Sequence, residues 1–329
     1  MKMFAYDLRP WDEQGFMKKY ANKYGVEYDF IDSEPTKANW ELAKGYEALN
    51  IITTKTDREM LEYMSAQGVK YIVTRSIGYD HIDVKAAHEL GMQVGHVAYP
   101  ANSVANYTIM MMLMCCRNIM QIEARAALQD YGLKGKIGRE ITGSTIGVIG
   151  TGKIGSTVIS HLSGFGCRLL AYDIVESDEV KKYAEYTDFD TLLKESDIIT
   201  LHAPATSENF HMMGKEQFEK CKDGVIIINC ARGALIDSDA MIEALQSGKI
   251  SAAGLDVIEN EFGLYYHNRM GDIIENKELS ILRSMPNVII SPHTAFYTDE
   301  AVAAMAENSI KALLAMERGE DSPLIVRRS

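Results

Sequence analysis

The chain has 329 residues, a length at which two domains are expected, since one domain usually holds about 150 residues. Hydrophobic residues make up 47% and charged residues 24%, which is the composition of a soluble globular protein and not of a disordered one. The formal charge of −12 disfavours nucleic acid and anionic membranes as partners, so any anionic ligand must meet a local positive charge.

Cysteine usage and the amino terminus both indicate a cytoplasmic protein. The five cysteines are odd in number and lack Cys-x-x-Cys spacing, which argues against a disulfide framework and a zinc knuckle. Charged residues come too early for the apolar core of a secretory signal. The most apolar run, residues 109–116, is about half of the ~20 residues that a membrane span needs. No histidine spacing suggests a metal site.

The first hundred residues alternate short apolar or β-branched runs with helix-like stretches. Helices are predicted over residues 57–67 and 82–90. Strands are predicted over residues 2–6, 26–31, 49–53, 71–74 and 93–96. Such alternation predicts a parallel sheet with right-handed crossovers.

Residues 102–125 contain neither glycine nor proline and are rich in Met, Leu, Ile and Ala, which predicts one long, largely buried helix. After it, a second series of strands begins, and an amphipathic helix is predicted over residues 299–318. The strands of this series are predicted over residues 145–149, 168–172, 198–202, 225–229, 252–256 and 288–291.

Residues 150–155 read Gly-x-Gly-x-x-Gly, directly after a predicted strand and at the start of a predicted helix. Gly150 permits a tight turn, Gly152 lets a pyrophosphate approach the backbone, and Gly155 allows the helix to pack closely on the strand. Asp173 ends the next strand about 20 residues later, where it would bind ribose hydroxyls and repel a 2′-phosphate. The pattern therefore indicates an NAD-binding Rossmann unit; the alternative is a structural glycine turn with a solvated aspartate.

Three segments near the end of the second series place polar residues just past predicted strands. Arg232 follows one strand, carboxylates lie within residues 256–261 after the next, and His293 follows the last. The carboxyl ends of strands in open α/β sheets are where ligands bind, so these groups form a candidate site. Taken singly, each could instead be a surface salt bridge or a turn residue.

As a set, these motifs resemble the D-isomer-specific 2-hydroxyacid dehydrogenases. The glycine loop with Asp173, residues 196–204 (SDIITLHAP) and residues 292–298 (PHTAFYT) fit the family. Residues 74–78 and 95–99 are similar to the D-lactate dehydrogenase branch, which includes the vancomycin-resistance enzyme.

The resemblance implies an NAD-dependent enzyme that reduces a small 2-oxo acid to its D-2-hydroxy acid. The implied fold is α/β, with a Rossmann-type doubly wound parallel-sheet cofactor domain over residues 101–297. A smaller flavodoxin-like α/β substrate domain would comprise residues 1–100 and 298–329, with the active site in a cleft between the two domains. The family also implies a homodimer built on residues 102–125, although composition alone fits a core helix nearly as well.

The family pattern assigns roles residue by residue. It makes Arg232 the clamp for the substrate carboxylate and carbonyl, His293 the acid/base, and Glu261 the partner of that histidine. The implied substrate-binding residues are Ile77 and Gly78, through their backbone N–H groups, and Tyr99 and Phe296 as pocket walls. The implied cofactor-binding residues are Gly150, Gly152, Lys153, Ile154, Gly155, Asp173, His202, Ala203, Pro204, Cys230, Ala231 and Asp256. For Asp256 the alternative role is to tune the pair of His293 and Glu261.

Two other functions remain open at this point. Ile52 stands where many family members carry an aromatic residue, which leaves room for a bulkier substrate of the 2-oxoisocaproate or phenylpyruvate type. A non-enzymatic, NAD-sensing role like that of the related corepressors is the other alternative, against which the intact Arg232, Glu261 and His293 argue. Arg75 follows a strand near the proposed carboxylate site, and we expect it to form an ion pair within its own domain.

Overall fold

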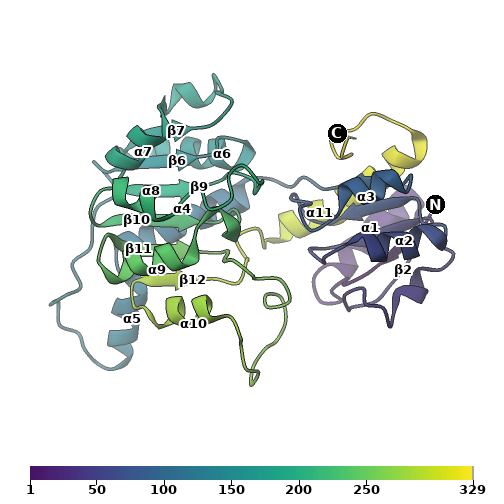
Figure 1. Ribbon diagram of the computed structural model, residues 1–329, viewed down its shortest axis with the longest axis horizontal. Helices are drawn as coiled ribbons and strands as arrows, with labels where there is room; N and C mark the ends of the chain where they lie inside the picture. Colours follow the sequence, from purple (N-terminus) through teal and green to yellow (C-terminus); the bar gives the residue numbers. More distant parts are fainter. Residues whose placement is uncertain (328–329) are drawn as a thin grey trace. The chain divides into compact units, whose positions relative to one another are not determined.

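A computed structural model describes residues 1–327. The chain divides into two compact units (Figure 1): a first unit of Met1–Pro100 with Tyr297–Ser329, and a second unit of Ala101–Phe296. The divisions expected from the sequence lie after residues 100 and 297. Each unit contains one sheet in which all paired strands are parallel.

The first unit has a five-stranded sheet in the order β2-β1-β3-β4-β5. Its strands are β1 (Lys2–Ala5), β2 (Glu27–Phe30), β3 (Ala48–Ile51), β4 (Tyr71–Thr74) and β5 (Gln93–Gly95). The direction of winding reverses between β1 and β3, as in flavodoxin-like folds. This confirms the fold expected for this part of the chain.

Helices cover both faces of this sheet. Two of them, α1 (Gln14–Tyr24) and α11 (Asp299–Arg318), pack against Met3, Ala5 and Val73 on one face. The other face carries α2 (Arg58–Ala66) and α3 (Val84–Glu89), packed on the alternate strand residues, with a short 3-10 helix, η1 (Trp40–Ala43), beside α2. Alternate residues of a strand point to opposite faces, so burial on both faces favours the mainly apolar central strands, whereas the edge strand β2 also carries the exposed Glu27 and Asp29.

The second unit has a seven-stranded sheet in the order β12-β11-β10-β9-β6-β7-β8. Its strands are β6 (Thr145–Ile149), β7 (Arg168–Tyr172), β8 (Glu185–Tyr186), β9 (Ile198–Leu201), β10 (Val225–Asn229), β11 (Ile250–Leu255) and β12 (Val288–Ile290). Counted from β6, the order of the first six strands is that of the Rossmann fold, with β12 added as a further strand. The winding reverses between β6 and β9.

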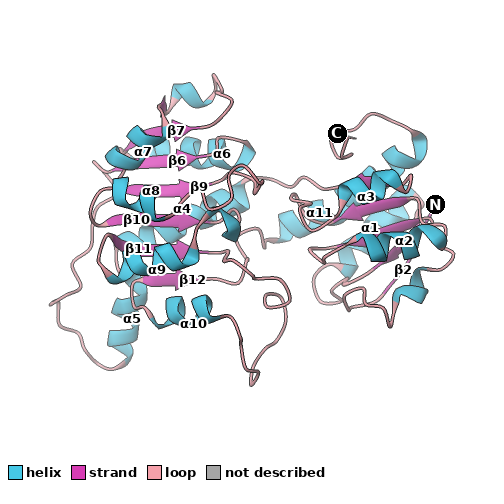
Figure 2. Ribbon diagram, viewed as in Figure 1, coloured by secondary structure: helices cyan, strands magenta, loops and turns pink. Residues whose placement is uncertain are grey.

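Helices lie on both faces of the second sheet as well (Figure 2). On one face α4 (Asn102–Cys116) contacts β10 and β11 and packs against α6 (Lys153–Leu162). The opposite face carries α7 (Phe189–Glu195), α8 (Lys215–Lys220), α9 (Ser238–Gln246) and α10 (Lys277–Ser284) over one continuous apolar core. Three short 3-10 helices complete the unit: η2 (Ser163–Phe165), η3 (Val180–Lys182) and η4 (Gly233–Leu235).

The prediction of one helix over residues 102–125 is wrong. The segment forms two helices, α4 and α5 (Ile119–Ala127), because Asn118 adopts a left-handed backbone with φ of 52° that an α-helix cannot contain. A distant segment also ends α4, since the Arg139 N–H donates to the Cys116 carbonyl at 2.7 Å. The break is therefore a tertiary effect combined with the tolerance of asparagine for this conformation.

The predicted strands are all present, with ends that differ by at most two residues, and α11 has the predicted bounds. The edge strand β8 was not predicted, because two residues carry no periodic signal. Within residues 1–327 no helix has both the length and the apolar character to span a membrane.

Candidate active site

The glycine loop lies between β6 and α6, where the strand order of the second sheet reverses. Gly150 has a φ of 88°, and a Cβ there would lie 2.7 Å from the Ala203 nitrogen. A Cβ on Gly155 would lie 1.9 Å from the Gly150 carbonyl oxygen, so neither position can hold a side chain. Gly152, in contrast, faces open space, since a Cβ there would have no atom within 4 Å. The loop is thus tight against the sheet and open above Gly152.

Asp173 follows β7 and binds the same loop. Its Oδ2 accepts hydrogen bonds from the Thr151 N–H (2.5 Å) and the Thr151 hydroxyl (3.1 Å), while Oδ1 accepts one from the Val175 N–H (3.1 Å). Burial acts to raise the pKa of Asp173, but the hydrogen bonds from Thr151 and Val175 prevail and hold it below its usual value. The carboxylate is therefore ionised at neutral pH and keeps acceptor capacity for hydroxyl groups beside the glycine loop.

His202, at the end of β9, lies on the other side of the glycine loop. Its Nε2 is 3.0 Å from the Thr200 hydroxyl, and its Nδ1 is buried without a hydrogen-bond partner. Burial lowers the pKa of His202 to about 3, so its ring is neutral at physiological pH. An orphaned buried polar atom of this kind is satisfied when a ligand or water reaches it.

These features fit a dinucleotide. Gly152 and the first N–H groups of α6 would hold the pyrophosphate, and Asp173 would hold the adenine ribose. Lys153 is exposed and Ile154 half-buried at the start of α6, and Ala203 and Pro204 follow β9 at the same sheet edge. Cys230, a buried residue beside Met111, and Ala231 follow β10 at that edge as well.

The acid/base candidate His293 is paired with Glu261. The His293 Nδ1–H donates to Glu261 Oε1 at 2.6 Å, and Glu261 Oε2 accepts from the Ile258 N–H at 3.0 Å. With Nδ1 committed to the carboxylate, Nε2 is the ring atom that can exchange a proton with a substrate. The two residues are 32 positions apart, and the fold brings them together beyond β11 and β12.

The backbone of His293 has a φ of 52°, a left-handed conformation that is strained for a residue with a side chain. The fully buried Asp256 holds it there. Its carbonyl accepts from the His293 N–H (2.8 Å), and its carboxylate accepts from the Ser291 hydroxyl (2.6 Å) and from the N–H groups of Thr294 and Ala295 (both 2.9 Å). The family pattern leaves two roles open for Asp256, at the cofactor site or in tuning the His293–Glu261 pair, and in the structure its carboxylate binds the histidine loop.

Arg232 follows β10, with its carbonyl accepting from the Asn229 side chain at 2.9 Å and its Nη1 donating to the Ala231 carbonyl at 2.8 Å. A Cβ on the next residue, Gly233, would lie 2.1 Å from the Ile258 backbone. The loop that carries Arg232 therefore packs directly on the segment that leads to Glu261. This contact fixes the positions of the two loops relative to each other.

Sequence reasoning missed two contributors to this edge. His211, which showed no functional pattern, places its Nε2 2.6 Å from Glu259 Oε1, and Glu259 Oε2 accepts from the Ser238 N–H at 3.0 Å. The Tyr266 hydroxyl donates to the His293 carbonyl at 3.0 Å. Neither contact has a signal in a single sequence, because the partners are 48 and 27 positions apart.

The predicted substrate-binding residues divide between the units. Phe296 is buried in the second unit, with its ring edge-to-face with His293 at 6.4 Å between centroids. Ile77 and Gly78 follow β4, and the half-buried Tyr99 follows β5, in the first unit. Among the described residues, the N–H groups of Ile77 and Gly78 donate no hydrogen bond. Two adjacent unpaired N–H groups can bind an anion.

Comparison with known proteins gives consistent matches along the chain. Residues 109–295 match the family described as D-isomer specific 2-hydroxyacid dehydrogenase, NAD binding domain. An aromatic 2-oxoacid reductase of Clostridium sporogenes is 47% identical over 320 residues, 96% of both chains. The D-lactate dehydrogenase of Escherichia coli K12 is 39% identical over 326 residues, 98% of this chain and 99% of that one.

A solved structure shares the fold over nearly its whole length. It is the NAD-complexed D-isomer specific 2-hydroxyacid dehydrogenase of Lactobacillus delbrueckii ssp. bulgaricus, with a TM-score of 0.84 and 32% identity. The match covers 99% of this chain and 100% of that one.

Replacing Asp256 tests whether it serves the histidine loop. Asp256→Asn replaces one acceptor oxygen by a donor that faces donors, so the loop should shift and kcat should fall on the order of 10²-fold, as misplaced catalytic groups do. NADH affinity, measured by fluorescence titration, should stay within about threefold of wild type because the glycine loop is unchanged. A large loss of NADH affinity with normal kcat would instead return Asp256 to the cofactor site.

Proposed function

Since the chain belongs to the D-isomer-specific 2-hydroxyacid dehydrogenases, NAD-dependent oxidoreductases, we propose that it reduces an aromatic 2-oxo acid of the phenylpyruvate type to the D-2-hydroxy acid. The observation that carries the reaction is the hydrogen-bonded pair of His293 and Glu261 at the sheet edge that also bears the glycine loop. The 47% identity to an aromatic 2-oxoacid reductase favours the aromatic side chain.

Different residues would carry the proton transfer and the binding of the substrate. NADH, when bound, supplies the hydride that adds to the carbonyl carbon. His293 donates the proton from Nε2 to the carbonyl oxygen and takes it back in the reverse reaction, while Glu261 keeps the ring oriented through Nδ1. Arg232 grips the substrate carboxylate and carbonyl through charge-assisted hydrogen bonds, and the N–H groups of Ile77 and Gly78 bind the carboxylate.

Several side chains support a bulky substrate. Ile52 is buried just after β3 and is smaller than the aromatic residue that many family members carry there. Around His293, the rings of Tyr266 and Phe296 lie 6.0 and 6.4 Å away between centroids, and 6.4 Å from each other. Aromatic rings at such distances favour edge-to-face contacts, which a phenyl side chain could extend. Pyruvate is the second candidate substrate, because a D-lactate dehydrogenase is 39% identical over almost the whole chain.

A panel of 2-oxo acids tests the substrate. We expect kcat/KM for phenylpyruvate to exceed that for pyruvate by about tenfold or more, since the larger side chain buries more apolar surface. NADH oxidation at 340 nm measures the rates, and chiral chromatography should show the D product. A preference for pyruvate would make the enzyme a D-lactate dehydrogenase; no turnover of any 2-oxo acid would refute the reaction itself.

Single substitutions test the catalytic roles. His293→Gln and Arg232→Gln should each lower kcat/KM by about 10²–10⁴-fold, because one removes the proton donor and the other the carboxylate clamp. Both variants should still bind NADH in a fluorescence titration. His88→Gln, in α3 of the first unit, is the matched control and should retain wild-type turnover. Near-normal activity of either active-site variant would disprove its role.

We also propose a homodimer, with a second copy of the chain covering α4 and α5. An open groove of about 710 Å³ is lined by Met110, Leu113 and Met114 of α4 and by Ile119 of α5. The segment after α5 exposes further apolar side chains, among them Leu133 and Ile137 at 87% and 90%. An exposed apolar surface of this extent usually marks an interface.

Light scattering tests the assembly. Wild type should have the mass of two chains, and a Leu133→Glu/Ile137→Glu variant should be monomeric, because burying two carboxylates opposes association. Ile174→Glu replaces an equally exposed isoleucine elsewhere and should leave the dimer intact. A monomeric wild type, or a dimer unaffected by the double substitution, would contradict this interface.

We propose that the enzyme is cytoplasmic. All five cysteines are free thiols, and four of them are buried. Unpaired buried cysteines are typical of proteins from reducing compartments.

A further inference from the structure

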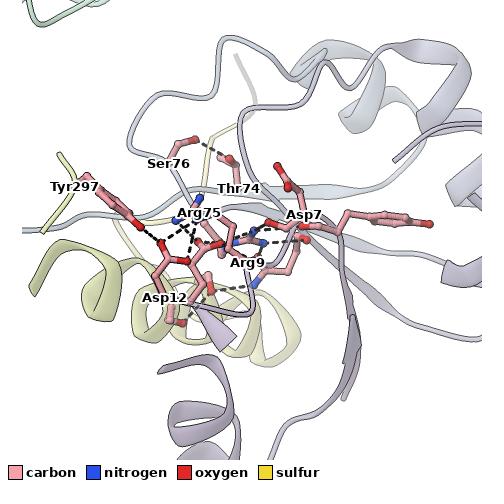
Figure 3. A network of polar contacts seen from close by, with 12 residues as sticks. Asp7, Arg9, Asp12, Thr74, Arg75, Ser76 and Tyr297 are labelled. Carbon is pink, nitrogen blue, oxygen red and sulfur yellow. Dashed lines mark hydrogen bonds and ion pairs between the residues drawn. The ribbon is translucent and has the colours of Figure 1, made fainter. Parts of the chain in front are cut away.

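Arg75 occupies the point in the first unit where the strand order reverses, between β1 and β3 (Figure 3). Its Nη2 donates to the carbonyls of Asp7 (2.6 Å) and Tyr6 (3.2 Å), and its Nη1 donates to Asn50 Oδ1 (2.8 Å). Its Nε donates to Glu13 Oε1 (3.0 Å), and both partners of this ion pair are at most 1% exposed. Ligands usually bind at such a reversal. In the first unit the buried guanidinium of Arg75 occupies this position.

The guanidinium has no donor left for a substrate. Arginine carries five N–H groups, and those of Arg75 are directed to Glu13, to the carbonyl and side chain of Asn50, and to the carbonyls of Tyr6 and Asp7. Arg75 therefore cannot act as a second carboxylate clamp, and the expected ion pair within its own unit is confirmed.

Further charged groups extend the pair into a larger network, in which the buried Arg9 Nη2 has no hydrogen-bond partner. Arg9 Nε donates to both carboxylate oxygens of Asp12 at 3.0 Å, and Arg9 Nη2 lies 3.4 Å from Glu13 Oε1. The Tyr297 hydroxyl donates to Asp12 Oδ2 at 2.5 Å (Figure 3), and the Arg9 guanidinium lies over the Tyr297 ring, 5.7 Å from its centroid. Asp7 adds a third acidic group, which interacts electrostatically with Arg75, Arg9 and Glu13. Removing either member of the buried Arg75–Glu13 pair leaves an uncompensated charge.

The residue after Arg75 begins the loop with the unpaired N–H groups. The Ser76 hydroxyl donates to the Gly78 carbonyl at 2.7 Å, which leaves it to accept from the Thr74 hydroxyl at 2.7 Å. Each hydroxyl has one hydrogen, so the buried His81 must donate from Nε2 to Thr74 (3.0 Å). This relay holds the loop closed on one side, while the Arg75 N–H, donating to the Ile51 carbonyl at 2.8 Å, anchors its start to β3.

We propose that Arg75 and Glu13 are positioning residues, whose buried ion pair sets the geometry of the Ile77 and Gly78 N–H groups toward the substrate carboxylate. The inference rests on the proposed function, since it requires a 2-oxo acid to bind this loop. Arg75 and Glu13 then affect substrate binding without contacting the substrate. Their replacement should change substrate affinity and not the rate of the chemical step.

Three variants test the proposal, each assayed for kcat, KM of the preferred 2-oxo acid, NADH affinity and thermal unfolding. Arg75→Lys keeps the charge but loses the planar set of donors, Glu13→Gln removes the counter-charge, and Ser76→Ala breaks the relay to Gly78. Each should raise KM about tenfold, the effect of weakening one charge-assisted hydrogen bond, with kcat within about threefold and NADH affinity unchanged. Titration of oxamate, an unreactive mimic of a 2-oxo carboxylate, into the NADH complex should show the same loss.

Tyr46→Phe is the matched control. It removes a hydrogen bond to Asp29 of β2, which is not part of the Arg75 network, and should leave KM unchanged. Wild-type KM in Glu13→Gln, or an equal KM rise in Tyr46→Phe, would overturn the proposal. If Arg75→Lys does not fold, Glu13→Gln decides the outcome. If the wild type reduces no 2-oxo acid, the proposed function fails first, and that result is distinct from a variant with normal KM.

Discussion

Parallel pairing of β6, β9, β10, β11 and β12 is the constraint on which the candidate site depends. In a parallel sheet every strand ends at the same edge, so the loops after these strands are neighbours although they span residues 150–296. The glycine loop, His202, Arg232 and His293 all come from this edge. The apolar core beneath it, buried on both faces, keeps the strand ends in register and so keeps the loops in place.

Each unit also has a buried charged side chain that organises the loops at its sheet edge, and in the first unit this side chain is paired with the buried Glu13. In the second unit the Asp256 carboxylate accepts hydrogen bonds from three groups of the His293 loop. In the first unit the Arg75 guanidinium donates to carbonyls at the end of β1 and to β3. An unpaired charge in a protein interior is costly, so each of these groups has strong reason to hold its partners in one arrangement. Asp256 is acidic and Arg75 is basic, but in both cases the cost of burying a charged group favours a fixed set of hydrogen-bond partners.

Strain at the site follows from this arrangement. His293 and Tyr266 both have left-handed backbones, with φ of 52° and 70°, and the Tyr266 hydroxyl binds the His293 carbonyl. Such conformations persist only where the surroundings determine them fully. The contacts from Asp256 and Tyr266 hold the His293 backbone in this conformation, and Glu261 orients the imidazole ring by accepting a hydrogen bond from Nδ1.

Local patterns in the sequence determined the strands, the glycine loop with Asp173, and the candidates Arg232, Glu261 and His293, because turn glycines and strand periodicity act over a few residues. Only the tertiary structure decided the break at Asn118, the hydrogen-bond geometry of the His293–Glu261 pair that the family resemblance implied, the place of Asp256 beneath the histidine loop, and the saturation of Arg75. These depend on contacts between residues far apart in the chain, and one sequence without relatives holds no record of which distant groups meet. The sequence thus identified the chemical groups, and the packing within each unit determined which partners they bind.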